Sequence, residues 1–177
     1  MHRLFVGLRP PPTMRAALLS LCGGIHNARW QNDEQLHCTL RYIGEVERPL
    51  AEDIALALGG VRAPALELSL HGVGCFSGRN RPNAVWAGVR PHDAVAALHR
   101  KVDQALARAG VPREGRAYLP HITLARLNAA AGPVDGFLSR HAGLESAPMR
   151  FEHFLLYEST LGSEGATYEA VASYPLE

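Results

Sequence analysis

Apolar residues recur along the chain with two different spacings, one typical of strands and one of helices. Short apolar or alternating runs predict strands at seven places: residues 3–8, 36–43, 66–72, 84–89, 118–126, 149–158 and 167–173. Apolar residues at helical spacing predict four helices between them: residues 12–23, 49–58, 93–109 and 134–140. The third helix has the clearest end, because Gly110 and Pro112 follow it. This order of elements indicates a mixed α and β class, without deciding whether the strands pair parallel or antiparallel.

The two halves of the chain repeat the same order of features. The sequence GLRP at 7–10 ends the first predicted strand, an Ala-Ala-Leu helix follows, and His37 comes 30 residues after Gly7. The sequence GVRP at 88–91 ends a later strand, another Ala-Ala-Leu helix follows, and His121 comes 33 residues after Gly88. Because the helix and the histidine spacing agree independently, we predict two copies of one unit, related by a pseudo-twofold axis.

Each half carries one four-residue frame, HCTL at 37–40 and HITL at 121–124. Successive side chains of a strand point to opposite faces. His37 and Thr39 therefore share one face, as do His121 and Thr123, while the apolar residues between them point to the core. If a pseudo-twofold axis relates the halves, two imidazoles and two hydroxyls converge on one cleft from opposite sides.

Such a cleft suits phosphoryl chemistry at a small phosphodiester. Histidine titrates near neutrality, so one imidazole can accept a proton while the other donates one. An in-line displacement at phosphorus needs both, because water must be activated on one side and the leaving alkoxide protonated on the other. The hydroxyls of Thr39 and Thr123 can donate hydrogen bonds to the non-bridging oxygens. Arg126, five residues after His121, can add a charge-assisted contact to the phosphate.

Two other kinds of site are poorly supported. A metal site would normally cluster carboxylates with the histidines, and neither strand has an Asp or Glu within four residues after its histidine. Nucleophilic catalysis lacks a candidate, since Cys38 points away from His37 and no G-x-S-x-G motif occurs. We therefore expect no metal and no cofactor.

Composition limits the remaining possibilities. A length of 177 residues, with 47 % hydrophobic and 20 % charged residues, is typical of one globular domain, 1–177. A net charge of +1 gives no basic field for coating nucleic acid, although a few arginines suffice for one phosphate. The three cysteines form no CxxC pair and read as free thiols of a reducing compartment. With no signal peptide or membrane span recognisable, we expect a cytoplasmic monomer with no membrane partner.

Five sequence segments together resemble a known family. They are RLFVGLRPP at 3–11, LHCTLRYIGEV at 36–46, GCFSGRNRPNAVWAGV at 74–89, YLPHITLAR at 118–126 and FLLYESTLGSEGATYEAV at 154–171. In this order the chain resembles the 2H phosphoesterases over nearly its full length. Within them it is similar to the bacterial and archaeal RNA 2′,3′-cyclic phosphodiesterases, first named 2′-5′ RNA ligases.

The resemblance implies a bilobal α+β fold, with two mainly antiparallel sheets facing a central cleft and helices outside. It implies metal-free hydrolysis of a ribose 2′,3′-cyclic phosphate, on an RNA end or a nucleotide, to a 2′-phosphate. His37 would be the proton donor and His121 the proton acceptor, with Thr39, Thr123 and Arg126 holding the phosphate. Two positions depart from the family pattern, and neither touches the chemistry: Cys38 replaces a usual aliphatic residue, and Tyr42 replaces phenylalanine or leucine.

Alternatives to this hydrolase stay open at this stage. The same site could join RNA ends as a 2′-5′ ligase, and a non-catalytic module could bind nucleotides or RNA in the same cleft. Aromatic residues near the motifs could stack a base, but we assign them to the core: Phe5, Tyr42, Phe76 and Tyr157.

Overall fold

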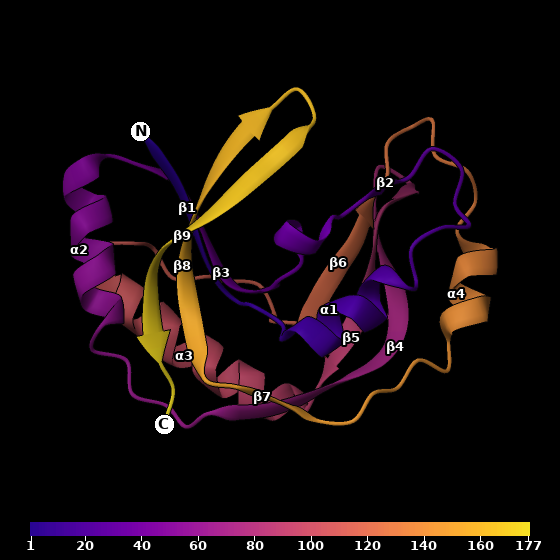
Figure 1. Cartoon of the computed structure of the whole chain (residues 1–177). Coiled ribbons are helices and arrows are strands. Elements are labelled where there is room, and N and C mark those ends of the chain that lie inside the picture. Colours follow the sequence, from indigo (N-terminus) through magenta and orange to yellow (C-terminus); the bar gives the residue numbers. More distant parts are fainter.

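The strands join in one antiparallel sheet that curves through the middle of the molecule (Figure 1). The computed structural model describes all 177 residues. Its strands are β1 (His2–Leu8), β2 (Arg29–Trp30), β3 (Cys38–Val46), β4 (Leu66–Gly78), β5 (Arg81–Arg90), β6 (His121–Arg126), β7 (Met149–Phe151), β8 (His153–Gly162) and β9 (Gly165–Pro175). Their order is β7-β4-β5-β6-β3-β1-β8-β9, with β2 paired to β6, and every pairing is antiparallel. The fold class is therefore α+β.

Four α-helices and one short 3₁₀ helix pack around this sheet: α1 (Pro12–Leu19), η1 (Asp33–Gln35), α2 (Arg48–Leu58), α3 (His92–Arg108) and α4 (Asp135–His141). Helix α3 packs against β3, β5 and α2, and α4 packs against β4 at the far end of the sheet (Figure 1). The spacing of apolar residues explains the position of α3, because Val95, Leu98, Val102 and Leu106 form one buried face. No helix is long and apolar enough to cross a membrane.

The apolar positions of both histidine motifs are buried, as their alternation predicts. Cys38, Leu40, Ile122 and Leu124 are each at most 1 % exposed and belong to the main hydrophobic core. The intervening His and Thr side chains are only half-buried. The prediction that each motif turns an apolar face inward and a polar face outward is confirmed.

The prediction of two separate sheets is wrong, because hydrogen bonds join all the strands in one sheet. β3 and β6 lie next to each other, and Cys38 pairs with Ile122, so the two motif strands connect one sheet. Cys38 and Ile122 are the only residues that pair between β3 and β6. A single inter-strand pair is enough to join two groups of strands that the sequence alone presents as separate.

Several predicted boundaries also differ from the structure. His37 lies just before β3, and the predicted strand 118–126 begins only at His121, where Pro120 can no longer interrupt the ladder. The predicted strand 149–158 is two strands, β7 and β8, that pair with opposite ends of the sheet. The predicted helix 12–23 stops at Leu19. Neither β2 nor η1 was expected, since segments of two or three residues have no detectable period.

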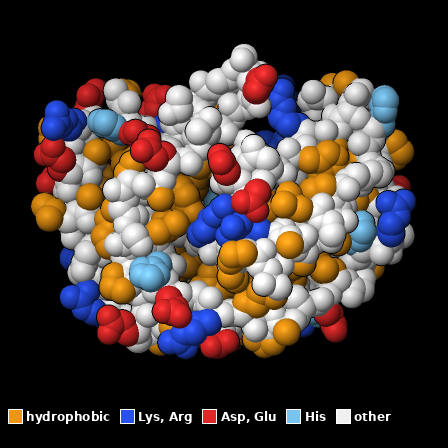
Figure 2. Space-filling view, viewed as in Figure 1, with side chains coloured by type: hydrophobic (Ala, Val, Ile, Leu, Met, Phe, Trp, Pro, Cys, Tyr) orange, Lys and Arg blue, Asp and Glu red, His pale blue; other side chains and the backbone are white.

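Charged side chains of both signs are intermingled over the face shown in Figure 2, and no large area carries one sign. This distribution agrees with the net charge of +1. Any attraction of a phosphate group must therefore come from individual arginines at a site, not from a broad field.

Candidate active site

The register of β3 and β6 brings both histidine motifs to one face of the sheet. Cys38 lies opposite Ile122 in an antiparallel pair. The residues before and after this pair point to the other face, so His37 lies across from Thr123, and Thr39 across from His121. The two frames therefore meet on one face as predicted, but they come from adjacent strands of one sheet and not from opposite sides of a cleft.

His37 is held on both ring nitrogens. Its Nδ1 lies 2.7 Å from the carbonyl oxygen of Gln35, and its Nε2 lies 2.9 Å from Thr39 Oγ1. Because a carbonyl oxygen only accepts, Nδ1 carries the proton and the neutral ring accepts the Thr39 hydroxyl at Nε2. Phe5 and Tyr168 pack on the imidazole with ring centroids 4.7 and 5.2 Å away. The reactive nitrogen therefore has a fixed direction.

Gln35 links this histidine to the β8–β9 hairpin. Its side chain completes a capping box with Asn32 at the start of η1, and its Nε2 donates to the Ala166 carbonyl at 2.8 Å. Its backbone carbonyl is the one that accepts from His37. One residue thus fixes the tautomer of His37 and the position of the strand that carries Tyr168.

His121 is held in a matching way. Its Nδ1 lies 2.7 Å from the carbonyl oxygen of Leu119, again two residues earlier in the chain. The Phe76 ring meets the imidazole edge-on at 4.8 Å, and Trp86 lies 5.9 Å away. As in His37, the proton sits on Nδ1, and the lone pair on Nε2 of His121 can accept a proton from a substrate or a water molecule.

The glycines of the two G-x-R-P frames lie opposite these motifs. Gly7 pairs with Thr39, and a Cβ there would lie 3.1 Å from the Cys38 carbonyl oxygen and 3.6 Å from the His37 ring. Gly88 pairs with His121, and a Cβ there would lie 2.3 Å from the His71 carbonyl oxygen. Gly88 needs glycine because another strand approaches its backbone closely, and at Gly7 a side chain would fit only tightly.

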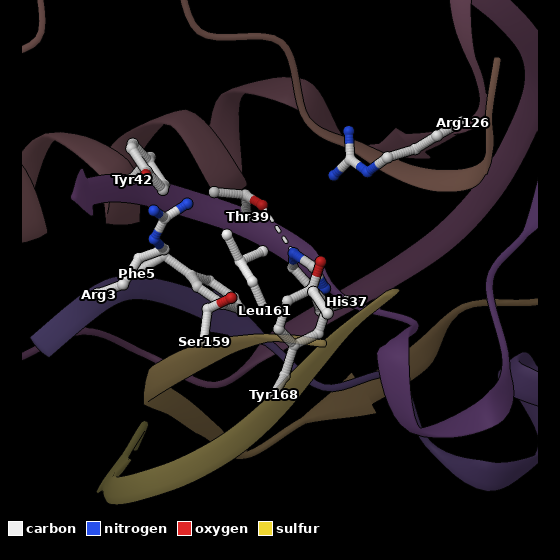
Figure 3. A pocket seen from close by; sticks show the side chains of 10 residues that line it. Arg3, Phe5, His37, Thr39, Tyr42, Arg126, Ser159, Leu161 and Tyr168 are labelled. Atoms are coloured by element: carbon white, nitrogen blue, oxygen red, sulfur yellow. Dashed lines mark hydrogen bonds between the residues drawn. The ribbon is translucent and has the colours of Figure 1, made fainter. Parts of the chain in front are cut away.

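Two adjoining cavities open on the polar faces of these motifs. The His37 cavity, about 300 Å³, is lined by Arg3, Phe5, His37, Thr39, Tyr42, Arg126, Ser159, Leu161, Ala166 and Tyr168 (Figure 3). The His121 cavity, about 540 Å³, includes His121, Phe76, Ser77, Asn83, Arg116 and Tyr118 in its lining. Thr39 and Tyr42 line both cavities. A phosphate at Thr39 would thus have one imidazole in the cavity on either side of it.

The surroundings of both imidazoles favour the neutral form in the free protein. Burial is the main cause that lowers the pKa of His37 to about 4, although its bond to Gln35 opposes the shift. The positive charge of Arg126 lowers it further. Burial and the Arg126 charge also lower the pKa of His121, against the bond to Leu119. Arg126 is therefore close enough to both rings to influence a phosphate held between them.

Most residues expected at the site gather there. His37, Thr39 and Arg126 line one cavity and His121 the other, whereas Thr123 shares their face but lines neither. The assignment of four aromatics to the core is only partly right. Phe5 and Tyr157 are buried at 4 and 5 % exposure, but Tyr42 is 53 % exposed in the cavity wall.

Other lining residues were not expected. Tyr168, Leu161 and Ser159 come from the β8–β9 hairpin, which pairing with β1 brings beside His37. Arg3 is in the first predicted strand, but its polar position alone does not distinguish a site residue from a solvated one. No group of three or more His, Cys, Asp or Glu side chains is arranged to hold a metal ion.

Comparisons with known proteins identify the family of the chain. The family model described as the 2′-5′ RNA ligase superfamily matches residues 13–162. An RNA 2′,3′-cyclic phosphodiesterase of Aeropyrum pernix is 32 % identical over 142 residues, 78 % of this chain and 81 % of that protein. A protein of the same name from Thermus thermophilus is 31 % identical over 98 % of this chain and 90 % of its own. The crystal structure of E. coli LigT complexed with 3′-AMP superposes with a TM-score of 0.79 at 25 % identity, covering 99 % of this chain and 98 % of that one. The chain belongs to the 2′-5′ RNA ligase superfamily.

Proposed function

We propose that this protein hydrolyses the 2′,3′-cyclic phosphate of an RNA end or a nucleotide to a 2′-phosphate, without a metal ion. The observation that carries the proposal is the matched pair of imidazoles, each with Nδ1 on a backbone carbonyl, in two cavities that share Thr39. The relatives named RNA 2′,3′-cyclic phosphodiesterase support the same substrate.

The reaction needs one proton removed and one supplied. Nε2 of His121 accepts a proton from water, and the oxygen of that water attacks phosphorus. The bond from phosphorus to the ribose O3′ breaks, and protonated Nε2 of His37 donates its proton to the departing O3′. Thr39 and Arg126, which line the His37 cavity, hold the non-bridging oxygens, where charge develops, and Thr123 supports them from the same face of the sheet. The product is a 2′-phosphate with a free 3′-hydroxyl, and the histidines exchange protons with solvent to begin again.

The lowered pKa values predict different pH profiles for free and substrate-bound enzyme. In the free protein His37 loses its proton above a pKa of about 4, and the pKa of His121 also lies below its usual 6.5. We therefore expect an optimum of kcat/KM below about pH 6.5, since that ratio reports the free enzyme. The bound phosphate anion stabilises the His37 imidazolium and offsets Arg126, so the optimum of kcat should lie at higher pH.

Arg126→Gln gives an independent check on this assignment. It removes a charge that lowers both histidine pKa values, so the kcat/KM profile should move to higher pH while phosphate binding weakens. Steady-state kinetics from pH 4 to 9 would measure both profiles. A wild-type optimum of kcat/KM above pH 7 would contradict catalysis by two histidines whose pKa values are lowered in the free protein.

We further propose that residues 1–177 form a single domain of two repeated lobes, and that the protein acts as a monomer in the cytoplasm. The strand order supports the repeat, because reading outward from β3 and β6 gives a G-x-R-P strand on either side, β1 and β5. The two imidazole–carbonyl contacts and the two close-packed glycines support it as well. Both histidines come from one chain, so catalysis needs no second subunit.

The decisive experiment is incubation with adenosine 2′,3′-cyclic phosphate, with and without EDTA. We expect the 2′-monophosphate as the sole product, resolved by chromatography from the 3′-isomer, and an unchanged rate with EDTA. A rate abolished by EDTA would contradict the metal-free mechanism. Saturable binding of adenosine 2′-phosphate without any turnover of the cyclic form would favour the non-catalytic binding module.

A second activity, 2′-5′ RNA ligation, is favoured by the size of the His121 cavity. A water molecule needs little of its 540 Å³, and Phe76 and Arg116 in its lining are suited to a base and a phosphate. A 5′-hydroxyl in that cavity could replace water as the nucleophile, with His121 accepting its proton. RNA halves bearing a 2′,3′-cyclic phosphate and a 5′-hydroxyl should then give a 2′-5′ linked product.

A further inference from the structure

Three alternate residues on one face of β1 form a line that leads away from His37. Gly7 lies beneath the His37 ring, Phe5 packs on it at 4.7 Å, and Arg3 follows two residues further along the strand. Alternate residues of a strand are about 6.6 Å apart. The wall of the His37 cavity therefore passes from the imidazole to an apolar ring and then to a guanidinium.

The Arg3 guanidinium is largely uncommitted. Its one hydrogen bond runs from Nη2 to Glu45 Oε1 at 2.9 Å, which leaves most of its N–H groups unused. The side chains of Arg3 and Glu45 are 33 and 52 % exposed, and exposed pairs of this kind are weak. In Figure 3 the guanidinium lies beside Tyr42, on the side of Thr39 away from His37 and Arg126. An anion entering the cavity can bind the unused N–H groups of Arg3 while Glu45 stays bound, or it can displace the Glu45 carboxylate.

We propose that Arg3 forms an anion subsite for the phosphate on the 5′ side of the terminal nucleoside. The subsite rests on the proposed function, because it takes the cyclic phosphate to lie at Thr39 and His37. The order of groups along β1 then matches the order of groups along an RNA end: cyclic phosphate, nucleoside, preceding phosphodiester. Leu161 and Tyr168 face the nucleoside from the hairpin side of the same cavity. The enzyme is thereby selective for oligonucleotide ends over nucleosides that bear only the cyclic phosphate.

Three substrates and two neighbouring substitutions test the subsite. The substrates are adenosine 2′,3′-cyclic phosphate, its 5′-phosphorylated form, and the dinucleotide ApA ending in a 2′,3′-cyclic phosphate. Arg3→Gln should raise KM about tenfold for the two substrates with a 5′ phosphate, the usual scale for losing a hydrogen bond to a charged group. It should leave kcat, and all constants for the plain cyclic nucleotide, nearly unchanged, and Arg3→Lys should recover part of the loss.

Glu45→Gln is the matched control with the opposite expected sign. It removes the competing carboxylate and frees Arg3, so KM for the 5′-phosphorylated substrates should fall severalfold. Equal losses of Arg3→Gln on all three substrates, or no loss on any, would overturn the subsite. An increase in KM with Glu45→Gln would also overturn it, since the pair would then be only structural. If wild-type protein hydrolyses none of the three substrates, the proposed function itself fails, and that outcome is distinct from all of these.

Discussion

Alanine in place of His37 or His121 is expected to lower kcat by about 10²- to 10⁴-fold on adenosine 2′,3′-cyclic phosphate, the usual contribution of a positioned general acid or base. In the proposed mechanism each ring supplies one of the two proton transfers, and no other imidazole lines the His37 cavity. Although His99 lines the His121 cavity, its Nδ1 is bonded to the Leu40 carbonyl and its ring stacks on Tyr118 at 4.3 Å. No neighbouring histidine can therefore replace either ring.

The double variant separates a shared mechanism from two independent effects. If both rings act on one phosphorus atom, losing the second should cost much less than losing the first, because the members of a catalytic unit are not additive. His153→Ala is a suitable control, since this exposed histidine begins β8. His37→Gln guards against a folding defect, because it fills more of the buried space than alanine. Retention of more than a tenth of wild-type kcat by either single variant would contradict the paired-histidine mechanism.

The pairing of His with Thr on one face could be predicted because it depends only on the two-residue period of a strand. The tautomers could not, because the carbonyls of Gln35 and Leu119 are aimed by the backbone just before each strand. That backbone has no periodic signal in the sequence. The duplicated frame predicts which two imidazoles act, and the structure adds which nitrogen of each bonds to the backbone and which one a substrate can meet.

Residues distant along the chain were the ones that sequence reasoning missed. Tyr168 packs on His37 only because β1 pairs with β8 and β8 with β9. These pairings depend on competition among many similar strands, which local propensity does not resolve. Tyr42 was assigned to the core for a related reason. The register shift between Val6 and Gly7 in the pairing with β3 leaves Leu40 without a partner, so Tyr42, opposite Phe5, lies on the same face as Thr39, opposite Gly7.

Replacing Arg41 by methionine is expected to destabilise the fold by about 3–5 kcal/mol, the usual cost of leaving one member of a buried ion pair alone. Arg41 Nε lies 3.0 Å from Asp103 Oδ1, and the two side chains are only 7 and 12 % exposed. The guanidinium also donates to the carbonyls of Tyr42 and Pro112. Urea unfolding would measure the change. Arg48→Met is the matched control, because its pair with Glu52 is 82 and 64 % exposed and should change stability by no more than about 0.5 kcal/mol.

The same ion pair has a consequence for the active site. Besides Arg41, Asp103 Oδ1 accepts the backbone N–H of Glu114 at 3.2 Å, and Arg41 holds Pro112. Together they fix the segment that leads to Leu119, whose carbonyl sets the tautomer of His121. An apolar double variant, Arg41→Met with Asp103→Leu, should recover much of the lost stability, because it removes both charges instead of stranding one. Its kcat should nevertheless stay below that of the wild-type protein, since the double variant restores packing without restoring the hydrogen bonds to Pro112 and Glu114. Full recovery of kcat together with stability would show that the segment before His121 needs no such anchor.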